Sequence, residues 1–343
     1  MVLLACQPSQ QKETITSPSE PSLTFAWQSL TSPTTASLRG LAVVSEDIAW
    51  VSGSLATVIK TTDGGQSWLQ FTFDVPDSLQ FRDIEAYGRD TAYVLSAGSP
   101  GLIFKTTDGG QSWRKQYENN APGIFLDGMA FWDSQRGVVM GDPLEGSFMI
   151  LRTEDGGENW QRVAAKNLPV PAEGEAGFAA SGTNIIAKGR SFVGFACGGK
   201  QSRFIYSEDG SQSWNAVKLP LVQGEASQGA FSLAFADTLR GVAVGGDFLQ
   251  ADDTTQTAAF TQDGGKTWRL AEKMPGGYRS GAAYVPTSEM FIATGTNGTD
   301  YSLDFGRTWQ AVDTVGYHAV QAVPGKRMAW LSGNDGKVAK LSW

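Results

Sequence analysis

Short runs that alternate apolar with small or polar residues recur along the chain, each broken by glycine or aspartate. The first group consists of three such runs, at 38–44, 48–52 and 57–61. Alternation with a period of two is typical of β-strands that bury one face, and turn residues between short runs indicate antiparallel pairing. Similar triplets precede five later turns and a seventh begins near Tyr317, so the pattern predicts an all-β protein.

Six of these triplets end in the same turn, Ser/Thr-x-Asp followed by glycines and then Trp. In the first copy, the Asp63 carboxylate can accept backbone amide hydrogen bonds, while Gly64 and Gly65 supply the positive φ of a tight hairpin. This is the Asp-box, or BNR repeat. Because it recurs once per unit, we interpret it as structural, although Ser211 and Phe305 replace one glycine each and predict looser turns there. The six aspartates are Asp63, Asp108, Asp155, Asp209, Asp263 and Asp304.

A repeat of 41 to 54 residues with several short strands per unit predicts a β-propeller. The seventh triplet, at 319–323, 328–331 and 337–341, has no outer strand because the sequence stops at Trp343. The run at 23–30 resembles the strand that follows each Asp-box and can supply it. We therefore predict a seven-bladed ring of four-stranded antiparallel blades over residues 23–343, closed in the last blade by the N-terminal strand.

Charge and composition disfavour several classes of ligand and partner. Asp and Glu number 35 against 27 Lys and Arg, a net charge of −8, which disfavours nucleic acid as a partner. The sequence has no apolar stretch long enough to span a bilayer, no glycine-rich phosphate loop and no Cys/His metal spacing. We expect no cofactor, no metal and a monomer.

The first 22 residues predict a tether. Leu3-Leu4-Ala5-Cys6 resembles a bacterial lipobox, in which Cys6 would carry lipid, although only five residues precede it. The following tract to Ser22 is rich in Ser, Pro, Gln, Glu and Thr, a composition typical of a disordered linker. These features predict a lipid-anchored protein of the bacterial cell envelope, in the periplasm or on the outer membrane; the alternative is an accidental cysteine. Cys197 lies in an apolar run and is expected to be a buried thiol.

Candidate binding residues follow from ring geometry, because every inner strand of a propeller starts at one mouth of the channel. The strand starts are Arg39, Arg82, Asp127, Ser181, Gln228, Arg279 and His318. Blades six, seven, one and two are neighbours, so the three arginines and His318 are expected to converge into a positive patch suited to carboxylates or phosphates. In the alternative, the arginines only pair with Asp83, Glu85 or Asp127.

Loops between second and third strands open on the same face and add three candidates, Asp142, Lys200 and Asp247. The longest of them, 247–257, also contains Asp252 and Asp253. Long loops in compact rings are often functional, and a calcium site here is the alternative to a solvated acidic loop.

Several segments beyond the Asp-boxes resemble the YCF48 family of photosystem II assembly factors, especially its relatives in non-photosynthetic bacteria. They are 136–143 with 150–153, 177–184, 240–247, 277–281 and 316–320. The resemblance implies a propeller that binds and escorts partner proteins through an arginine-lined face without catalysis. Arg39, Arg82 and Arg279 would form that face.

Two other functions stay open. A sialidase-like glycoside hydrolase would use those arginines to grip a carboxylate, Tyr278 or Tyr317 as nucleophile, Glu85 as its helper and Asp83 or Asp127 as acid. Against it, Arg39-Gly40-Leu41 replaces the Arg-Ile-Pro of sialidases, which usually have six blades. A carbohydrate-binding surface module would instead use mouth aromatics such as Tyr278, Tyr317 and Phe248.

Overall fold

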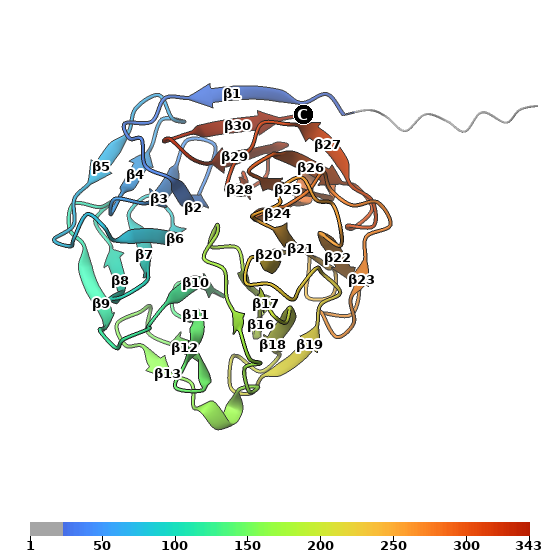
Figure 1. Ribbon diagram of the computed structural model, residues 1–343. Coiled ribbons are helices and arrows are strands. Elements are labelled where there is room, and N and C mark those ends of the chain that lie inside the picture. The colour runs from blue at the N-terminus through green and yellow to red at the C-terminus, as the bar shows by residue number, and fades with distance from the viewer. Residues whose placement is uncertain (1–22) are drawn as a thin grey trace, which may run out of the picture.

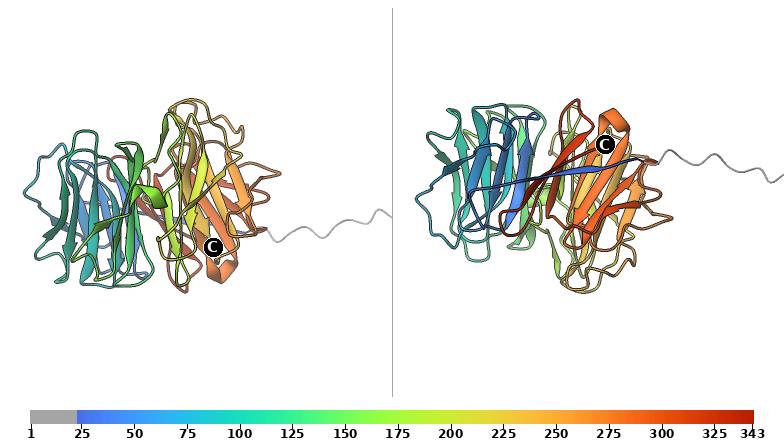
Figure 2. Two further views of the ribbon diagram at one scale, coloured as in Figure 1. Left: turned by 90° about the horizontal axis from the view of Figure 1, so that it is seen from below. Right: turned by 90° about the horizontal axis from the view of Figure 1, so that it is seen from above.

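The computed structural model describes residues 23–343, which form seven antiparallel sheets arranged around a central axis (Figure 1). Six sheets have four strands each, and the fifth blade carries two further short strands at its inner edge. Seen from the side, the sheets stand next to one another around the ring (Figure 2). The predicted fold class is therefore confirmed. No helix in the described part of the chain is long and apolar enough to cross a membrane.

The strands of the first three blades are β2 (Leu38–Val43), β3 (Ala49–Gly53), β4 (Val58–Thr61), β5 (Leu69–Phe71), β6 (Gln80–Tyr87), β7 (Thr91–Ala97), β8 (Gly101–Thr106), β9 (Arg114–Asn119), β10 (Leu126–Phe131), β11 (Gly137–Leu144), β12 (Ser147–Thr153) and β13 (Gln161–Arg162). Blade four consists of β15 (Ile185–Lys188), β16 (Phe192–Ala196), β18 (Arg203–Ser207) and β19 (Asn215–Lys218). Blade five contains β20 (Gln228–Phe235), β21 (Gly241–Asp247), β22 (Ala258–Thr261) and β23 (Arg269–Leu270), with β14 (Glu175–Ala176) and β17 (Gly198–Gly199) added. Blade six contains β24 (Gly281–Val285), β25 (Met290–Gly295), β26 (Gly298–Ser302) and β27 (Gln310–Asp313). Two 3-10 turns, at Ala165–Asn167 and Pro286–Ser288, are the helical elements of the described residues.

The last blade joins the two ends of the described chain. Strand β1 (Ala26–Leu30) pairs antiparallel with β30 (Val338–Ser342), outside β29 (Met328–Ser332) and β28 (Ala319–Ala322). Both figures show β1, in blue, beside the red C-terminal strands. The Trp27 ring also stacks on Tyr317, with 5.5 Å between ring centroids. The predicted closure is confirmed, and it leaves no unpaired edge on β30.

The Asp-box turns have the predicted hydrogen bonds. Asp63 Oδ1 accepts from the Ser67 backbone N–H at 2.9 Å and from the Thr61 hydroxyl at 2.8 Å. The Ser67 hydroxyl donates to Oδ2, and this bond, followed by the other two, lowers the pKa of the Asp63 carboxyl to about 2. At the two departures, Ser211 and Phe305 adopt φ of 70° and 58°, so the turns keep their shape without the glycine. The expectation of looser turns there was wrong, because the aspartate contacts outweigh the cost of the left-handed backbone.

Hydrophobic cores lie between adjacent blades, and lysines from the third strands reinforce some of these contacts. Lys60 Nζ lies 4.4 Å from the Trp50 ring centroid and donates to the Gly109 carbonyl of the next blade at 3.1 Å. In the same way, Lys105 of blade two donates to the Gly156 carbonyl in the Asp-box of blade three. Cys197 is fully buried and is a free thiol, as predicted.

Blade four departs from the regular pattern in a way that closes the channel. Its inner strand β15 is short, and residues 177–184 before it, which we call the plug segment, cross the centre of the ring (yellow-green in Figure 1). Contacts from several blades hold this segment. The Ser181 hydroxyl donates to the Ser280 carbonyl at 2.7 Å, and Thr183 Oγ1 lies 2.6 Å from Ser232 Oγ. As a result, separate cavities lie on the two sides of the plug segment.

Candidate functional site

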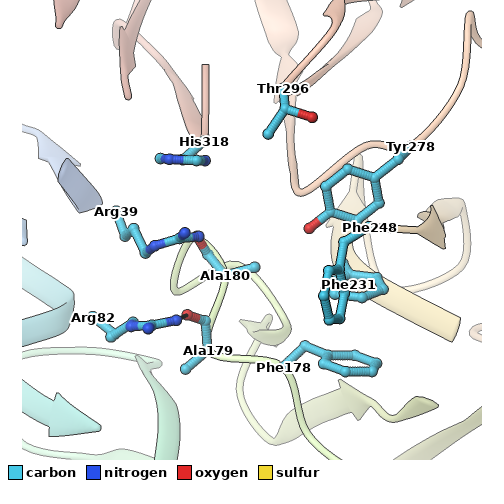
Figure 3. A pocket seen from close by; sticks show the side chains of 10 residues that line it. All are labelled: Arg39, Arg82, Phe178, Ala179, Ala180, Phe231, Phe248, Tyr278, Thr296 and His318. Atoms are coloured by element: carbon cyan, nitrogen blue, oxygen red, sulfur yellow. Dashed lines mark hydrogen bonds between the residues drawn. The ribbon is translucent and has the colours of Figure 1, made fainter. Parts of the chain in front are cut away.

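A cavity of about 260 Å³ lies above the plug segment, at the mouth where the inner strands begin (Figure 3). We call it the mouth cavity. Its lining comes from blades one, two, five, six and seven and from the plug, and consists of Arg39, Arg82, Phe178, Ala179, Ala180, Phe231, Phe248, Tyr278, Thr296 and His318. No Asp or Glu is among these residues. The cavity therefore combines basic, aromatic and backbone polar groups without a carboxylate.

Two arginines form one wall and point toward the backbone of the plug segment (Figure 3). Arg39 Nη1 donates to the Ala180 carbonyl at 3.3 Å, and Arg82 Nη1 donates to the Ala179 carbonyl at 3.0 Å. Arg82 Nε and Nη2 also donate to Gln80 Oε1, at 2.9 and 2.6 Å. A guanidinium has five N–H groups, so both arginines keep donors for a ligand while the protein fixes their orientation.

The two guanidiniums repel each other. Burial lowers the pKa of Arg82 to about 10, with a further contribution from the Arg39 charge, and burial lowers the pKa of Arg39 as well. Both stay protonated at neutral pH. Among the described residues both guanidiniums donate to plug carbonyls and neither forms an ion pair, although the charge of Asp127 offsets part of the lowering of the Arg82 pKa. An anion in this cavity would relieve the repulsion.

Aromatic rings form the opposite wall of the mouth cavity (Figure 3). Phe178 stacks on Phe231 with centroids 3.9 Å apart, and Phe231 meets Tyr278 edge to face at 4.8 Å. Phe248, 47% exposed, extends this wall at the rim. Sequence reasoning missed Phe178 and Phe231, because a single aromatic in a strand start is no different from a core residue until the ring positions are known. This wall can take an apolar or planar group next to an anion.

His318 lines the cavity as predicted, but as a neutral side chain. Its Nε2 lies 2.7 Å from Asn334 Oδ1, which also accepts from the Ser37 hydroxyl at 2.8 Å. Nε2 is therefore the protonated nitrogen, and Nδ1 keeps a lone pair. Burial and the Arg39 charge lower the pKa of His318 to about 4. The imidazole therefore adds no charge to the patch, because burial and the nearby guanidiniums disfavour a further cation.

Arg279 does not line the mouth cavity, although Arg39, Arg82 and His318 do converge. Its side chain is 2% exposed, and Nε donates to Asp300 Oδ2 at 2.6 Å. Its Nη1 donates to Asn297 Oδ1 and to the Tyr278 carbonyl, each at 2.7 Å. The Arg279 guanidinium thus forms a buried ion pair within its own blade and also holds the backbone carbonyl of Tyr278.

Three of the predicted carboxylates do not line the mouth cavity, and one of them, Asp142, holds the plug segment. Asp83 accepts from the backbone N–H groups of Ile84 and Met129 at 2.8 and 2.6 Å, and burial raises its pKa to about 7. Asp142 accepts from the Gly177 N–H at 2.7 Å, and burial raises its pKa to about 6. Asp127 is fully buried, and burial together with the Asp142 charge raises its pKa.

Three further candidates have other partners. Lys200 pairs with Glu173 at 2.7 Å on the surface, and Asp247 accepts from the Leu249 N–H at 2.9 Å. Tyr317 is buried against Trp27. None of the three lines the mouth cavity.

The acidic loop after Asp247 is held by a contact to blade six and by a contact within the loop. Asp252 accepts from the Asn297 amide at 2.8 Å, and Asp253 accepts from the Thr255 N–H at 2.8 Å. Among residues 23–343, no group of three or more His, Cys, Asp or Glu side chains could hold a metal ion. Cys6 lies outside the described residues.

The elements of a sialidase-like mechanism are not brought together. Tyr278 lines the mouth cavity, whereas Glu85 lines the cavity of about 380 Å³ on the far side of the plug segment. Burial raises the pKa of the Tyr278 hydroxyl, and no carboxyl group lines the same cavity to accept its proton. The residues named for that mechanism therefore do not share one cavity.

Fold and site together define an Asp-box β-propeller with a self-plugged channel and a mouth that offers two guanidiniums opposite an aromatic wall. Residues 20–130 match the model of the family described as Photosynthesis system II assembly factor YCF48, which confirms the resemblance seen in the sequence.

Two solved structures share the fold. One is "YCF48 bound to D1 peptide", with 19% identity and a TM-score of 0.65, covering 95% of this chain and 99% of that chain. The other is YCF48 from Cyanidioschyzon merolae, with 17% identity and a TM-score of 0.62, covering 92% and 99% of the two chains. No curated protein matches the chain.

Proposed function

We propose that this chain is a non-catalytic, assembly-factor-like propeller that binds an acidic segment of a partner protein in the mouth cavity. Arg39 and Arg82 hold the carboxylate, and the wall of Phe231 and Tyr278 takes an apolar side chain next to it. The similar YCF48 structure in complex with a D1 peptide supports a polypeptide as the class of ligand.

The observation that carries the proposal is the pair of oriented guanidiniums without a carboxylate partner. Arg39 and Arg82 are partly buried, are fixed by plug carbonyls, and lie in a protein of net charge −8. Desolvation of two like charges costs folding free energy, and a bound anion offsets part of that cost. A carboxylate fits the forked donors that remain.

The test compares capture of cell-envelope proteins by immobilised wild type and by the double variant Arg39→Gln/Arg82→Gln. Quantitative mass spectrometry should show at least a ten-fold loss of specific partners from the double variant. Lys200→Gln is the matched control, since it removes a surface charge that does not line the cavity. Equal capture by wild type and by the double variant would contradict the proposal.

An acidic carbohydrate is the second candidate, because the exposed Phe248 and the ring of Tyr278 can stack on a sugar. A glycan array with sialylated and uronate-containing members separates the two functions. Retention of such a glycan, lost in Tyr278→Ala, would favour the carbohydrate over the peptide.

We also propose that the protein acts at the cell envelope on a lipid anchor. The proposal is supported by Leu3-Leu4-Ala5-Cys6 and the polar tract after it. Metabolic labelling with a palmitate analogue should mark the wild type and not Cys6→Ser. Labelling of neither protein would count against the anchor.

A further inference from the structure

A second cavity of about 260 Å³ adjoins the mouth cavity at the rim between blades two and three. We call it the rim groove. Its lining is mixed: Pro76, Leu79, Ala97, Pro100 and Phe125 are apolar, and Ser78, Gln80, Arg82 and Ser99 are polar. Arg82 lines both this groove and the mouth cavity, so one guanidinium borders the two spaces.

The rim groove has room for a side chain whose apolar atoms contact Leu79, Pro100 and Phe125 beside polar neighbours. Arg82 is the only charged residue in its lining, and Leu79 is buried at its base while Pro76 and Ser99 are exposed at its edges. Gly98 has open space within 4 Å of the position that a Cβ would take, so another chain can approach the backbone there. Burying an apolar side chain on such a surface is favourable in proportion to the area removed from water.

Arg82 is held in place between the two spaces. Gln80 Oε1 accepts hydrogen bonds from Nε and Nη2, and the Ala179 carbonyl accepts one from Nη1. The guanidinium therefore has little rotational freedom. A carboxylate bound to its remaining N–H groups would have the aromatic wall on one side and the rim groove on the other. A small anion would fill only the first space. An extended polypeptide, whose side chains project alternately along the strand, can reach both.

We propose that the rim groove is a second subsite for the partner segment, which takes an apolar side chain on the far side of the acidic residue from the aromatic wall. The ligand is then an extended peptide with an acidic residue between two apolar ones. This inference rests on the proposed function, since it places the acidic residue at Arg39 and Arg82.

Isothermal titration calorimetry with a synthetic peptide series tests it. Each nonapeptide is N-acetylated, C-amidated and built of Gly and Ser, with Phe next to a central Glu, and Leu occupies each remaining position in turn. One Leu position should tighten binding at least five-fold over the Leu-free peptide. That gain should disappear in Ser78→Trp and in Ser99→Trp, which fill the groove from exposed positions.

Ser134→Trp is the matched control, because it adds the same ring at an exposed position in the β10–β11 connection, at the other end of the inner strands. It should leave the gain intact. A gain that survives both groove-filling variants, or no gain at any Leu position, would overturn the second subsite. If the Leu-free peptide binds and loses affinity in Arg39→Gln, the proposed function stands even when the subsite fails. If no peptide binds, both are overturned.

Discussion

Removing the positive charge of Arg279 should destabilise the ring strongly, although the residue lies outside the mouth cavity. The variant Arg279→Met keeps the aliphatic stem and leaves Asp300 buried without its cation. The two side chains are 2% and 3% exposed, so water does not replace the lost partner. Breaking a buried pair from one side typically costs about 3–5 kcal/mol. Unfolding entropy scales with chain length, and for a ring of about 320 residues this loss corresponds to a fall in Tm of about 5–7 °C.

The sign of the pH dependence is a second readout. Burial already raises the pKa of Asp300, and loss of Arg279 raises it further. An acid whose folded pKa exceeds the unfolded value stabilises the fold at low pH, and this contribution is lost as pH rises through the folded pKa. The deficit of Arg279→Met relative to wild type should therefore be smaller at pH 5 than at pH 8.

Thermal and urea unfolding at both pH values measure these effects. Arg279→Met/Asp300→Asn is the informative comparison, because the amide removes the orphan charge and keeps an acceptor for the Gly276 N–H. It should recover much of the lost stability. A single variant that loses less than about 1 kcal/mol, or a double variant no more stable than the single one, would refute the argument from a buried charge.

Further predictions concern the buried carboxyls, the contacts between blades and the closing strand. Because burial raises the pKa of Asp83 to about 7 and of Asp142 to about 6, each carboxyl destabilises the fold increasingly as pH rises from about 4, near the unfolded pKa, to its folded pKa, and has no further effect above it. Asp142→Asn keeps the acceptor for the plug, so its Tm should rise relative to that of the wild type between about pH 4 and 6 and then stay level, as scanning fluorimetry against pH would show; a Tm difference that does not change with pH would contradict this. Lys60→Met removes a bond to the next blade and a cation over a tryptophan ring, so urea unfolding should show a loss of about 1–2 kcal/mol; no change would mean that blade contacts do not need the lysine. Trp27→Ala weakens the closing strand and should lower Tm while promoting self-association in light scattering, because β30 then exposes its edge; an unchanged monomer would argue against closure by β1.

The fold was predictable because its information is local and repeated. Each Asp-box encodes a turn whose aspartate contacts lie within a few residues, so Asp63 alone indicates how the other five turns fold. Blade seven followed from counting strands, since a propeller without an outer strand at Trp343 must find one elsewhere. Likewise, Arg39, Arg82 and His318 meet because strand starts share one mouth.

The remainder depends on side-chain direction and on one irregular segment. Arg279 starts a strand like Arg39, yet Asp300 from the same blade captures it, and strand position alone does not reveal such a partner. The sequence pattern predicts that a strand starts at Ser181. In the structure β15 begins only at Ile185, and the chain before it crosses the channel. Glycines permit that path, because a Cβ at Gly182 would lie 2.1 Å from Asp83 Oδ1. Such tertiary fits leave no periodic signal in sequence.

The plug segment explains how an acidic protein can keep a useful pair of cations. Its carbonyls at Ala179 and Ala180 accept from Arg82 and Arg39, which offsets part of their desolvation and fixes both guanidiniums before any ligand arrives. A ligand therefore does not have to freeze two long side chains, a cost that usually weakens arginine sites. The mutual repulsion of the two guanidiniums instead lowers the unfolding free energy of the ring. Under the proposed function, the closed channel thus orients the mouth: the plug segment fixes the two arginines through backbone oxygens and adds the Phe178 ring to the aromatic wall.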